Sequence, residues 1–249
     1  MSGLFRWLAF WSSLPVSAVE GLWLRRTALR LPEAGGARCG VAGVGPGMHL
    51  LALGDSIIAG VGTGTMEHSL PVQFAHALAA SRACAVHWRA EGANGADIRD
   101  LRERIGGLPA DCRADLILIS IGVNDVTGLS STRHWRSQLE WLVNDIWNRW
   151  PQAGVVFAGL PPMGRFPLPP QPLRFTLGHR AATLDAMAAD IIARQTGMLH
   201  VPTDISPLEH GFCEDGFHPS SQSCAFWASV LAQKVEAANV VRVPVKGTA

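Results

Sequence analysis

The sequence predicts an α/β fold in which a parallel sheet lies between two layers of helices. Short apolar runs of strand length alternate with longer segments of helical periodicity, a pattern typical of parallel strands joined by helical crossovers. Connected in this way, five strands predict a doubly wound sheet with the strand order 2-1-3-4-5. The apolar runs lie at about residues 49–53, 85–90, 115–121, 155–160 and 198–201.

The helical segments are indicated by their apolar spacing and by their ends. In the clearest case, apolar residues recur at steps of three or four, so they share one helix face that we expect to be buried. This helix stops at Pro151, and its apolar residues are Trp135, Leu139, Leu142, Ile146 and Trp150. Asp97 is placed to cap another helix. The five helices are expected at about residues 71–80, 97–105, 135–150, 175–195 and 219–235.

The composition disfavours several classes of function. The chain of 249 residues suits one α/β domain, and 48% hydrophobic against 16% charged residues predicts a large core. A formal net charge of +1 gives no reason to expect nucleic acid as a partner. The 5 cysteines include no CxxC pair, so we predict no metal site. Whether Cys213 and Cys224 form a disulfide stays open, because spacing alone does not establish the geometry.

The first 30 residues form a separate apolar segment, for which three interpretations are open. Residues 7–19 are largely apolar, but a membrane span needs roughly 20 such residues, and Pro15 and several serines interrupt this stretch. The segment fits an interfacial membrane helix, a cleaved signal sequence or a helix packed on the domain. We expect a membrane-associated or exported bacterial protein rather than a freely cytoplasmic one. The other divisions are a Gly/Ala/Pro-rich linker at 31–47, the α/β domain at 48–240 and a C-terminal tail at 241–249.

The stretch from Leu50 to Gly60 carries the first candidate for chemistry. Its apolar run ends in Gly54-Asp55-Ser56, so Ser56 is expected at the carboxyl end of the first strand, where ligands bind in open α/β sheets. A helix start after Ser56 would favour developing negative charge. We therefore predict that Ser56 is a nucleophile and that Asp55 orients the turn.

A serine nucleophile needs a neighbouring base, and the segment Asp215-Gly216-Phe217-His218 offers one. Histidine suits this role because it gains and loses a proton near neutral pH. A carboxylate three residues earlier can hold the other ring nitrogen across a tight turn. We predict His218 as the base and Asp215 as its partner, with Asp204 as the fallback carboxylate.

Three donors are expected around the oxyanion of a tetrahedral intermediate. They are the backbone N–H groups of Ser56 and Gly95 and the side-chain amide of Asn124, each from a turn that follows a predicted strand. Glycine at position 95 lets a substrate approach the backbone closely. Asp125, the next residue after Asn124, is assigned a structural role.

These residues resemble the SGNH, or GDSL, hydrolase family, whose first name stands for serine, glycine, asparagine and histidine. The resemblance covers about residues 50–232 and implies a flavodoxin-like three-layer fold that hydrolyses esters or thioesters without a metal or other cofactor. Ile57 stands where the family name has leucine. Gly95 is chosen over Gly92 because the Asn-Gly-Ala pattern fits better. The matching blocks are Gly54-Asp55-Ser56-Ile57, Asn94-Gly95, Gly122-Val123-Asn124-Asp125 and Asp215-Gly216-Phe217-His218-Pro219.

A bacterial branch of that family is resembled by three further stretches. These are the apolar N-terminus, Leu31-Pro32-Glu33-Ala34 and the proline-rich run from Leu160 to Pro167. Because the branch includes members associated with long-chain N-acyl amino acid biosynthesis, the resemblance suggests a substrate with an acyl chain.

We therefore predict a serine hydrolase that cleaves small-molecule or lipid carboxylic esters through a triad of Ser56, His218 and Asp215. Within hydrolases, the alternatives are an acyl thioesterase, a lysophospholipase or a deacetylase of acetylated sugars. A non-catalytic lipid-binding module is the alternative from another class, but such a module needs no base beside a serine. A nucleotide binder is disfavoured, because the sequence has no phosphate-loop glycine pattern with a lysine.

Overall fold

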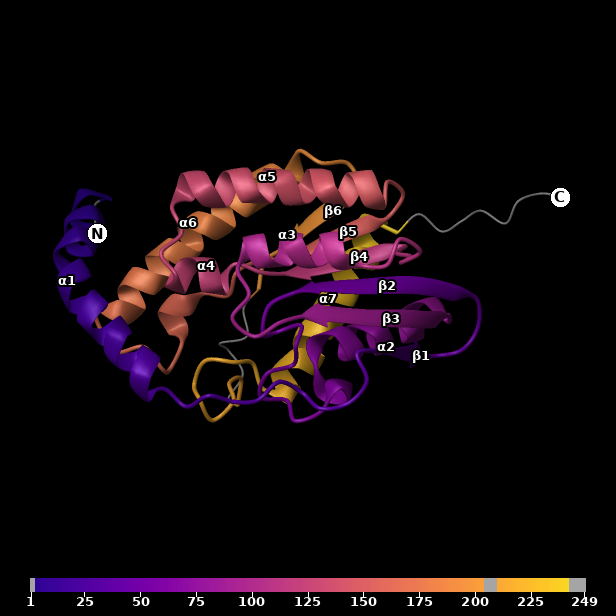
Figure 1. Cartoon of the computed structure of the whole chain (residues 1–249), viewed down its shortest axis with the longest axis horizontal. Helices are drawn as coiled ribbons and strands as arrows, with labels where there is room; N and C mark the ends of the chain where they lie inside the picture. The colour runs from indigo at the N-terminus through magenta and orange to yellow at the C-terminus, as the bar shows by residue number, and fades with distance from the viewer. Residues whose placement is uncertain (1–2, 204–209, 242–249) are drawn as a thin grey trace.

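A single sheet of six strands forms the centre of the molecule, with helices on both faces (Figure 1). The computed structural model describes residues 3–203 and 210–241, with side chains from residue 10 onward. The strand order is β1-β3-β2-β4-β5-β6, and all pairs are parallel except β1 with β3. The strands are β1 (Cys39–Ala42), β2 (Gly47–Gly54), β3 (Ala85–Gly92), β4 (Leu116–Ser120), β5 (Gly154–Ala158) and β6 (Met198–Val201).

The α/β fold and the order of the five parallel strands are confirmed, but the strand count and the linker need correction. Residues 31–47, predicted as a linker, contain β1, which pairs antiparallel with the outer edge of β3 from Cys39 opposite Arg89 to Ala42 opposite Val86. The segment is short and contains glycine, so it has little strand signal of its own. It forms a strand because the edge of β3 offers unpaired N–H and carbonyl groups.

Seven α-helices are described, and those that follow the sheet strands cover its two faces (Figure 1). Helices α3, α5 and α6 lie on one face, whereas α2 and α7 lie on the other. The helices are α1 (Gly3–Thr27), α2 (Leu70–Arg82), α3 (Ile98–Gly107), α4 (Val123–Thr127), α5 (Thr132–Arg149), α6 (Leu173–Ala193) and α7 (Ser221–Ala238). Two single turns of 3-10 helix, η1 (Met66–His68) and η2 (Met163–Arg165), lie in loops.

The core is divided by the sheet into two apolar clusters. Along β2, Leu50 packs into the cluster with α2 and α7, whereas Leu51 packs into the cluster with α3, α5 and α6. Because successive side chains of a strand point to opposite faces, a strand covered on both faces is apolar throughout. The predicted helix face is buried as expected, with Trp135 fully buried and its indole N–H donating to the Leu184 carbonyl over 3.0 Å.

The N-terminal segment is the long helix α1, which packs along α6 at one end of the sheet (Figure 1). The buried Ser17 hydroxyl lies 2.9 Å from that of Thr176, and Glu20 accepts a hydrogen bond from the Leu173 N–H over 2.9 Å. The helix is therefore packed on the domain, which was one of the three interpretations. None of the helices described here has the length and apolar character needed to cross a membrane.

The open question about cysteine pairing is answered in the described part of the chain. Cys213 and Cys224 are both free thiols, as are the other three cysteines. Burial raises the pKa of Cys224 to about 12 and that of Cys213 to about 11. Both side chains are therefore protonated at neutral pH.

Candidate active site

The turn after β2 holds Ser56 at the carboxyl end of the sheet. Gly54 ends the strand so close to β4 that a Cβ atom there would collide with the Ser120 carbonyl oxygen. The Asp55 N–H donates to that carbonyl over 3.1 Å, and the Ile57 N–H donates to Oδ1 of Asp55 over 3.0 Å. These bonds fix the turn and leave Ser56 6% exposed.

Asp55 is completely buried beneath the nucleophile candidate. Its Oδ2 has no hydrogen-bond partner among the residues that the structure describes. Burial raises the pKa of Asp55 to about 7, although the Ile57 N–H and the nearby His218 favour the charged carboxylate. The carboxyl group therefore carries a proton over most of the acidic range, in a position suited to orienting the turn.

A second turn, before α7, brings His218 to Ser56. The His218 Nε2 lies 3.1 Å from Oγ of Ser56, and its Nδ1 lies 2.6 Å from Oδ2 of Asp215. The turn is tight because Gly216 adopts a φ of +63°, a conformation that glycine reaches without strain. The structure thus joins the three predicted side chains in one continuous line from carboxylate to imidazole to hydroxyl.

The Asp215 carboxylate is held in its charged form by its own turn. Burial opposes ionisation, but hydrogen bonds from the His218 ring and from the backbone N–H groups of Phe217 and His218 outweigh it, so the pKa of Asp215 is lowered. The two N–H groups donate to Oδ1 over 2.9 and 3.0 Å. Oδ2 is left to accept from the imidazole, which fixes the ring with Nε2 directed at the serine.

The three predicted oxyanion donors come from turns that lie close together. Asn124 follows β4 at the start of α4, and its side-chain amide donates to the Ala96 carbonyl over 2.9 Å. Ala96 is the residue after Gly95, so this bond ties the second and third donor turns together. Within the described part of the chain, the backbone N–H groups of Ser56 and Gly95 have no acceptor. Two unengaged donors in such turns are available to a developing oxyanion.

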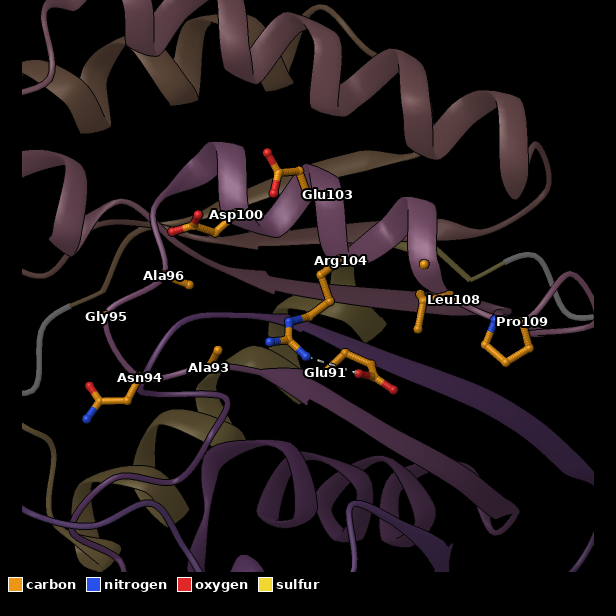
Figure 2. Close-up of a pocket in the computed structure, with 11 residues that line it drawn as sticks. Glu91, Ala93, Asn94, Gly95, Ala96, Asp100, Glu103, Arg104, Leu108 and Pro109 are labelled. Carbon is orange, nitrogen blue, oxygen red and sulfur yellow. Dashed lines mark ion pairs between the residues drawn. The ribbon is translucent and has the colours of Figure 1, made fainter.

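Gly95 and Gly92, the two glycine candidates, lie in different surroundings. Gly92 ends β3 against the serine turn, where a Cβ atom would collide with the Ala59 nitrogen, so it is a packing glycine. Gly95 has a φ of +81° and open space around its Cβ position. Figure 2 shows it between Asn94 and Ala96 on the loop from β3 to α3, at one end of an open cavity of about 680 Å³.

The remaining acidic candidates have structural places or lie outside the described residues. Asp125 is fully buried and accepts hydrogen bonds from the Ile98 N–H over 3.1 Å and the Ser130 hydroxyl over 3.0 Å. It therefore joins α3 to α4, and burial raises its pKa to about 6. Asp204, the fallback carboxylate, falls outside the described residues. Nowhere in the described ranges do three or more His, Cys, Asp or Glu side chains form a group that could hold a metal ion.

A largely apolar cavity of about 450 Å³ opens beside His218, and sequence reasoning did not foresee that α1 forms part of its wall. The walls come from α1, from α6 and from the proline-rich loop that precedes α6. This loop is held over the site because the Leu168 N–H donates to the Gly216 carbonyl over 3.1 Å. The apolar lining residues are Leu24, Ala28 and Leu29 from the α1 end, Leu168 and Pro169 from the loop, and Leu173 and Leu177 from α6.

A segment of the predicted linker, residues 32–38, runs from the α1 end to β1 along the serine turn. The Gly62 N–H donates to the Pro32 carbonyl over 3.1 Å, and Arg38 donates to the Ala59 carbonyl over 3.0 Å. Glu33 accepts a hydrogen bond from the Asn94 N–H over 2.7 Å. The segment, called the strap below, therefore contacts both the Ser56 turn and the loop that carries Gly95.

Solved structures with this fold are found among esterases. A carbohydrate acetylesterase family member from Sinorhizobium meliloti is 21% identical, with a TM-score of 0.58 over 77% of this chain and 98% of that one. The acetylxylan esterase Axe2 from Geobacillus stearothermophilus is 20% identical, with a TM-score of 0.54 over 80% and 98%. LAE5, an alpha/beta hydrolase from the metagenome of Lake Arreo, Spain, is 17% identical, with a TM-score of 0.58 over 81% and 98%.

Comparison at the level of sequence families identifies the chain. No curated protein matches it. Residues 52–225, from β2 into α7, match the GDSL-like Lipase/Acylhydrolase family, and this range holds all five residues predicted for the site. The chain therefore belongs to the GDSL-like lipase/acylhydrolase family and is a carboxylic ester hydrolase.

Proposed function

We propose that the protein hydrolyses esters of acyl chains through a triad of Ser56, His218 and Asp215. The observation that carries this proposal is the unbroken line of contacts from Asp215 Oδ2 through the His218 ring to Ser56 Oγ. A serine hydroxyl is a weak nucleophile until an adjacent base takes its proton. A base held by a buried carboxylate has no evident use beside a serine that serves only as a turn residue.

The proposed reaction follows from these contacts. His218 takes the Ser56 proton while Oγ attacks the ester carbonyl, and the backbone N–H groups of Ser56 and Gly95 and the Asn124 amide stabilise the oxyanion. The imidazolium, stabilised by Asp215, gives its proton to the departing alcohol, which leaves an acyl group on Ser56. Water then attacks this acyl-enzyme with His218 as base, and the carboxylic acid and free serine are released.

The acyl part of the proposal is supported by the cavity of about 450 Å³ beside His218. Its five leucines and Pro169 suit an alkyl chain, whereas an acetyl group would leave most of the cavity unfilled. The acetylesterases among the similar structures favour a second candidate, the removal of acetyl groups from sugars. The two candidates predict opposite dependence of the rate on acyl length.

The test is hydrolysis of p-nitrophenyl esters from acetyl to palmitoyl by the wild type, by Ser56→Ala and by Ser137→Ala. Ser137 lies on α5, away from the candidate site, and its hydroxyl donates to the His134 carbonyl, so it is a matched control. We expect Ser56→Ala to lower kcat by roughly 10⁴- to 10⁶-fold, as for other serine triads. Activity that survives in Ser56→Ala would refute the triad, and a sharp preference for acetyl esters would replace the acyl-chain proposal with the deacetylase.

A further inference from the structure

The outer face of α1 exposes a group of large apolar side chains. Val16, Val19, Leu22 and Trp23 are each between 52% and 67% exposed. At about 3.6 residues per turn they fall within one third of the helix circumference, opposite the buried Ser17 that packs on α6. A contiguous apolar patch of this kind on a solvent-exposed face marks an interaction site more often than scattered single residues do.

The same helix ends in positive charge. Arg25, Arg26 and Arg30 are all exposed at or just beyond its C-terminal end. The only acidic residue of α1, Glu20, points to the other side, where it accepts a hydrogen bond from the Leu173 N–H. Arg25 donates to the Thr127 carbonyl and Arg30 donates to the Arg25 carbonyl, whereas Arg26 makes no hydrogen bond or ion pair with the residues described. The exposed face thus combines tryptophan, aliphatic side chains and unopposed arginine, as in helices that lie in a bilayer interface.

We propose that this outer face of α1, defined by Val16, Val19, Leu22, Trp23 and Arg26, docks the protein on an anionic lipid bilayer. The apolar side chains would enter the boundary between headgroups and acyl chains, and Arg26 would meet a lipid phosphate. In this proposal the helix lies on the bilayer surface and does not cross it, in agreement with the finding that none of the described helices is both long and apolar enough to span a membrane.

The inner face of α1 connects membrane docking to the cavity beside His218, and this step rests on the proposed acyl-ester function. Leu24, on the side of α1 opposite the docking face, and Ala28, directly after the end of α1, line the cavity beside His218. One helix therefore has a lipid-facing side and a side that borders the catalytic groups. A lipid ester leaving the bilayer would reach Ser56 by passing along this helix, without crossing open water.

The test is co-sedimentation of the full chain with sucrose-loaded vesicles. One set contains equal parts of phosphatidylcholine and phosphatidylglycerol, and the other contains phosphatidylcholine alone. We expect binding to the anionic vesicles that weakens with added salt, because the lipid charges are screened. Arg26→Gln should weaken it roughly fivefold, and Val19→Ser with Trp23→Ser should weaken it further.

Matched controls separate docking from general stickiness. Phe226→Ser removes an apolar side chain that is 46% exposed on α7, and Arg113→Gln removes an exposed arginine that precedes β4. Both should bind the vesicles as the wild type does. Equal binding by the α1 variants and the controls would overturn the proposal, as would wild-type protein that stays in the supernatant.

A second copy of the chain is the competing occupant of this face. In that case the wild type would elute as a dimer in size-exclusion chromatography, Trp23→Ser would elute as a monomer, and vesicles would not bind. Because co-sedimentation requires no turnover, Ser56→Ala should bind vesicles normally. Loss of activity on all esters with intact vesicle binding would count against the proposed function alone.

Discussion

Asp55 shows how the site places a carboxyl group where its charge is costly. The pKa of Asp55 is raised to about 7 by burial, whereas an aspartate in an unfolded chain has a pKa of about 3.9. Between these values the folded state holds a proton that the unfolded state has lost. The free energy of unfolding should therefore decrease as the pH rises from about 4 to about 7, by an amount on the order of a few kcal/mol.

Replacing Asp55 with asparagine should flatten this dependence, because the side chain then has no proton to lose. The measurement is denaturant unfolding of the wild type and of Asp55→Asn across this range. The pKa of Asp125 is raised to only about 6, so the difference should be clearest between about pH 6 and pH 7. Asp190→Asn, at an exposed ion pair with Arg194, should keep the wild-type slope. Parallel slopes for Asp55→Asn and the wild type would refute this account.

Asn124 allows the oxyanion donors to be tested separately from the triad. Asn124→Ala should lower kcat by about 10²- to 10³-fold with a small change in KM, because the lost hydrogen bond strengthens only in the transition state. Asn144→Ala, at an exposed asparagine of α5, is the matched control. The Asn124 amide also bonds to the Ala96 carbonyl, so thermal unfolding must be measured alongside. An Asn124→Ala enzyme with full kcat would remove Asn124 from the mechanism.

At this scale the sequence indicated which residues to examine but could not give their distances. Ser56, Gly95 and Asn124 were predicted because each follows a strand, and parallel strands end at one edge of a sheet. The contact of His218 with Ser56 joins positions 162 residues apart, and no local pattern specifies such a contact. Their catalytic roles stay predictions until the substitutions are measured.

Among the elements, those with strong local signals were predicted well. Asp97 was predicted as a helix cap, and its side chain accepts hydrogen bonds from the Arg99 and Asp100 N–H groups. The Asp100 side chain in turn accepts a hydrogen bond from the Asp97 N–H. β1 and α4 were missed because neither carries a periodic pattern. β1 depends on the edge of β3, and α4 is a helix of one turn between β4 and α5.

A substitution in α1 can test whether the acyl chain binds in the cavity beside His218, because Gly21 lines this cavity. A Cβ atom at Gly21 would meet nothing within 4 Å, so a larger side chain fits there. Gly21→Leu should narrow the cavity while favouring the helix by roughly 0.8 kcal/mol. We expect kcat/KM to fall for long-chain p-nitrophenyl esters and to stay unchanged for acetyl esters.

The control for that experiment is Gly106→Leu, because Gly106 on α3 also has open space at its Cβ position and lies away from this cavity. It should leave the chain-length profile unchanged. If Gly21→Leu hydrolyses all esters at the wild-type rate, the acyl chain does not occupy this cavity.

At the scale of the whole molecule, the sheet order was predictable, whereas the place of α1 was not. Five parallel strands with right-handed crossovers leave few possible arrangements, and the predicted order is the one observed. The position of α1 instead depends on pairs such as Ser17 with Thr176 and Glu20 with Leu173, which are distant in the chain. Apolar content alone therefore left three interpretations of the N-terminal segment open.

The strap has a mechanical consequence for the molecule. It connects α1 to β1, and between these ends it is bonded to the Ala59 carbonyl of the Ser56 turn and to the Asn94 N–H beside Gly95. A displacement of α1 should therefore move the two turns that carry the Ser56 and Gly95 N–H groups before it affects the sheet. We therefore expect the spacing of the Ser56 and Gly95 N–H groups to depend on the position of the N-terminal helix.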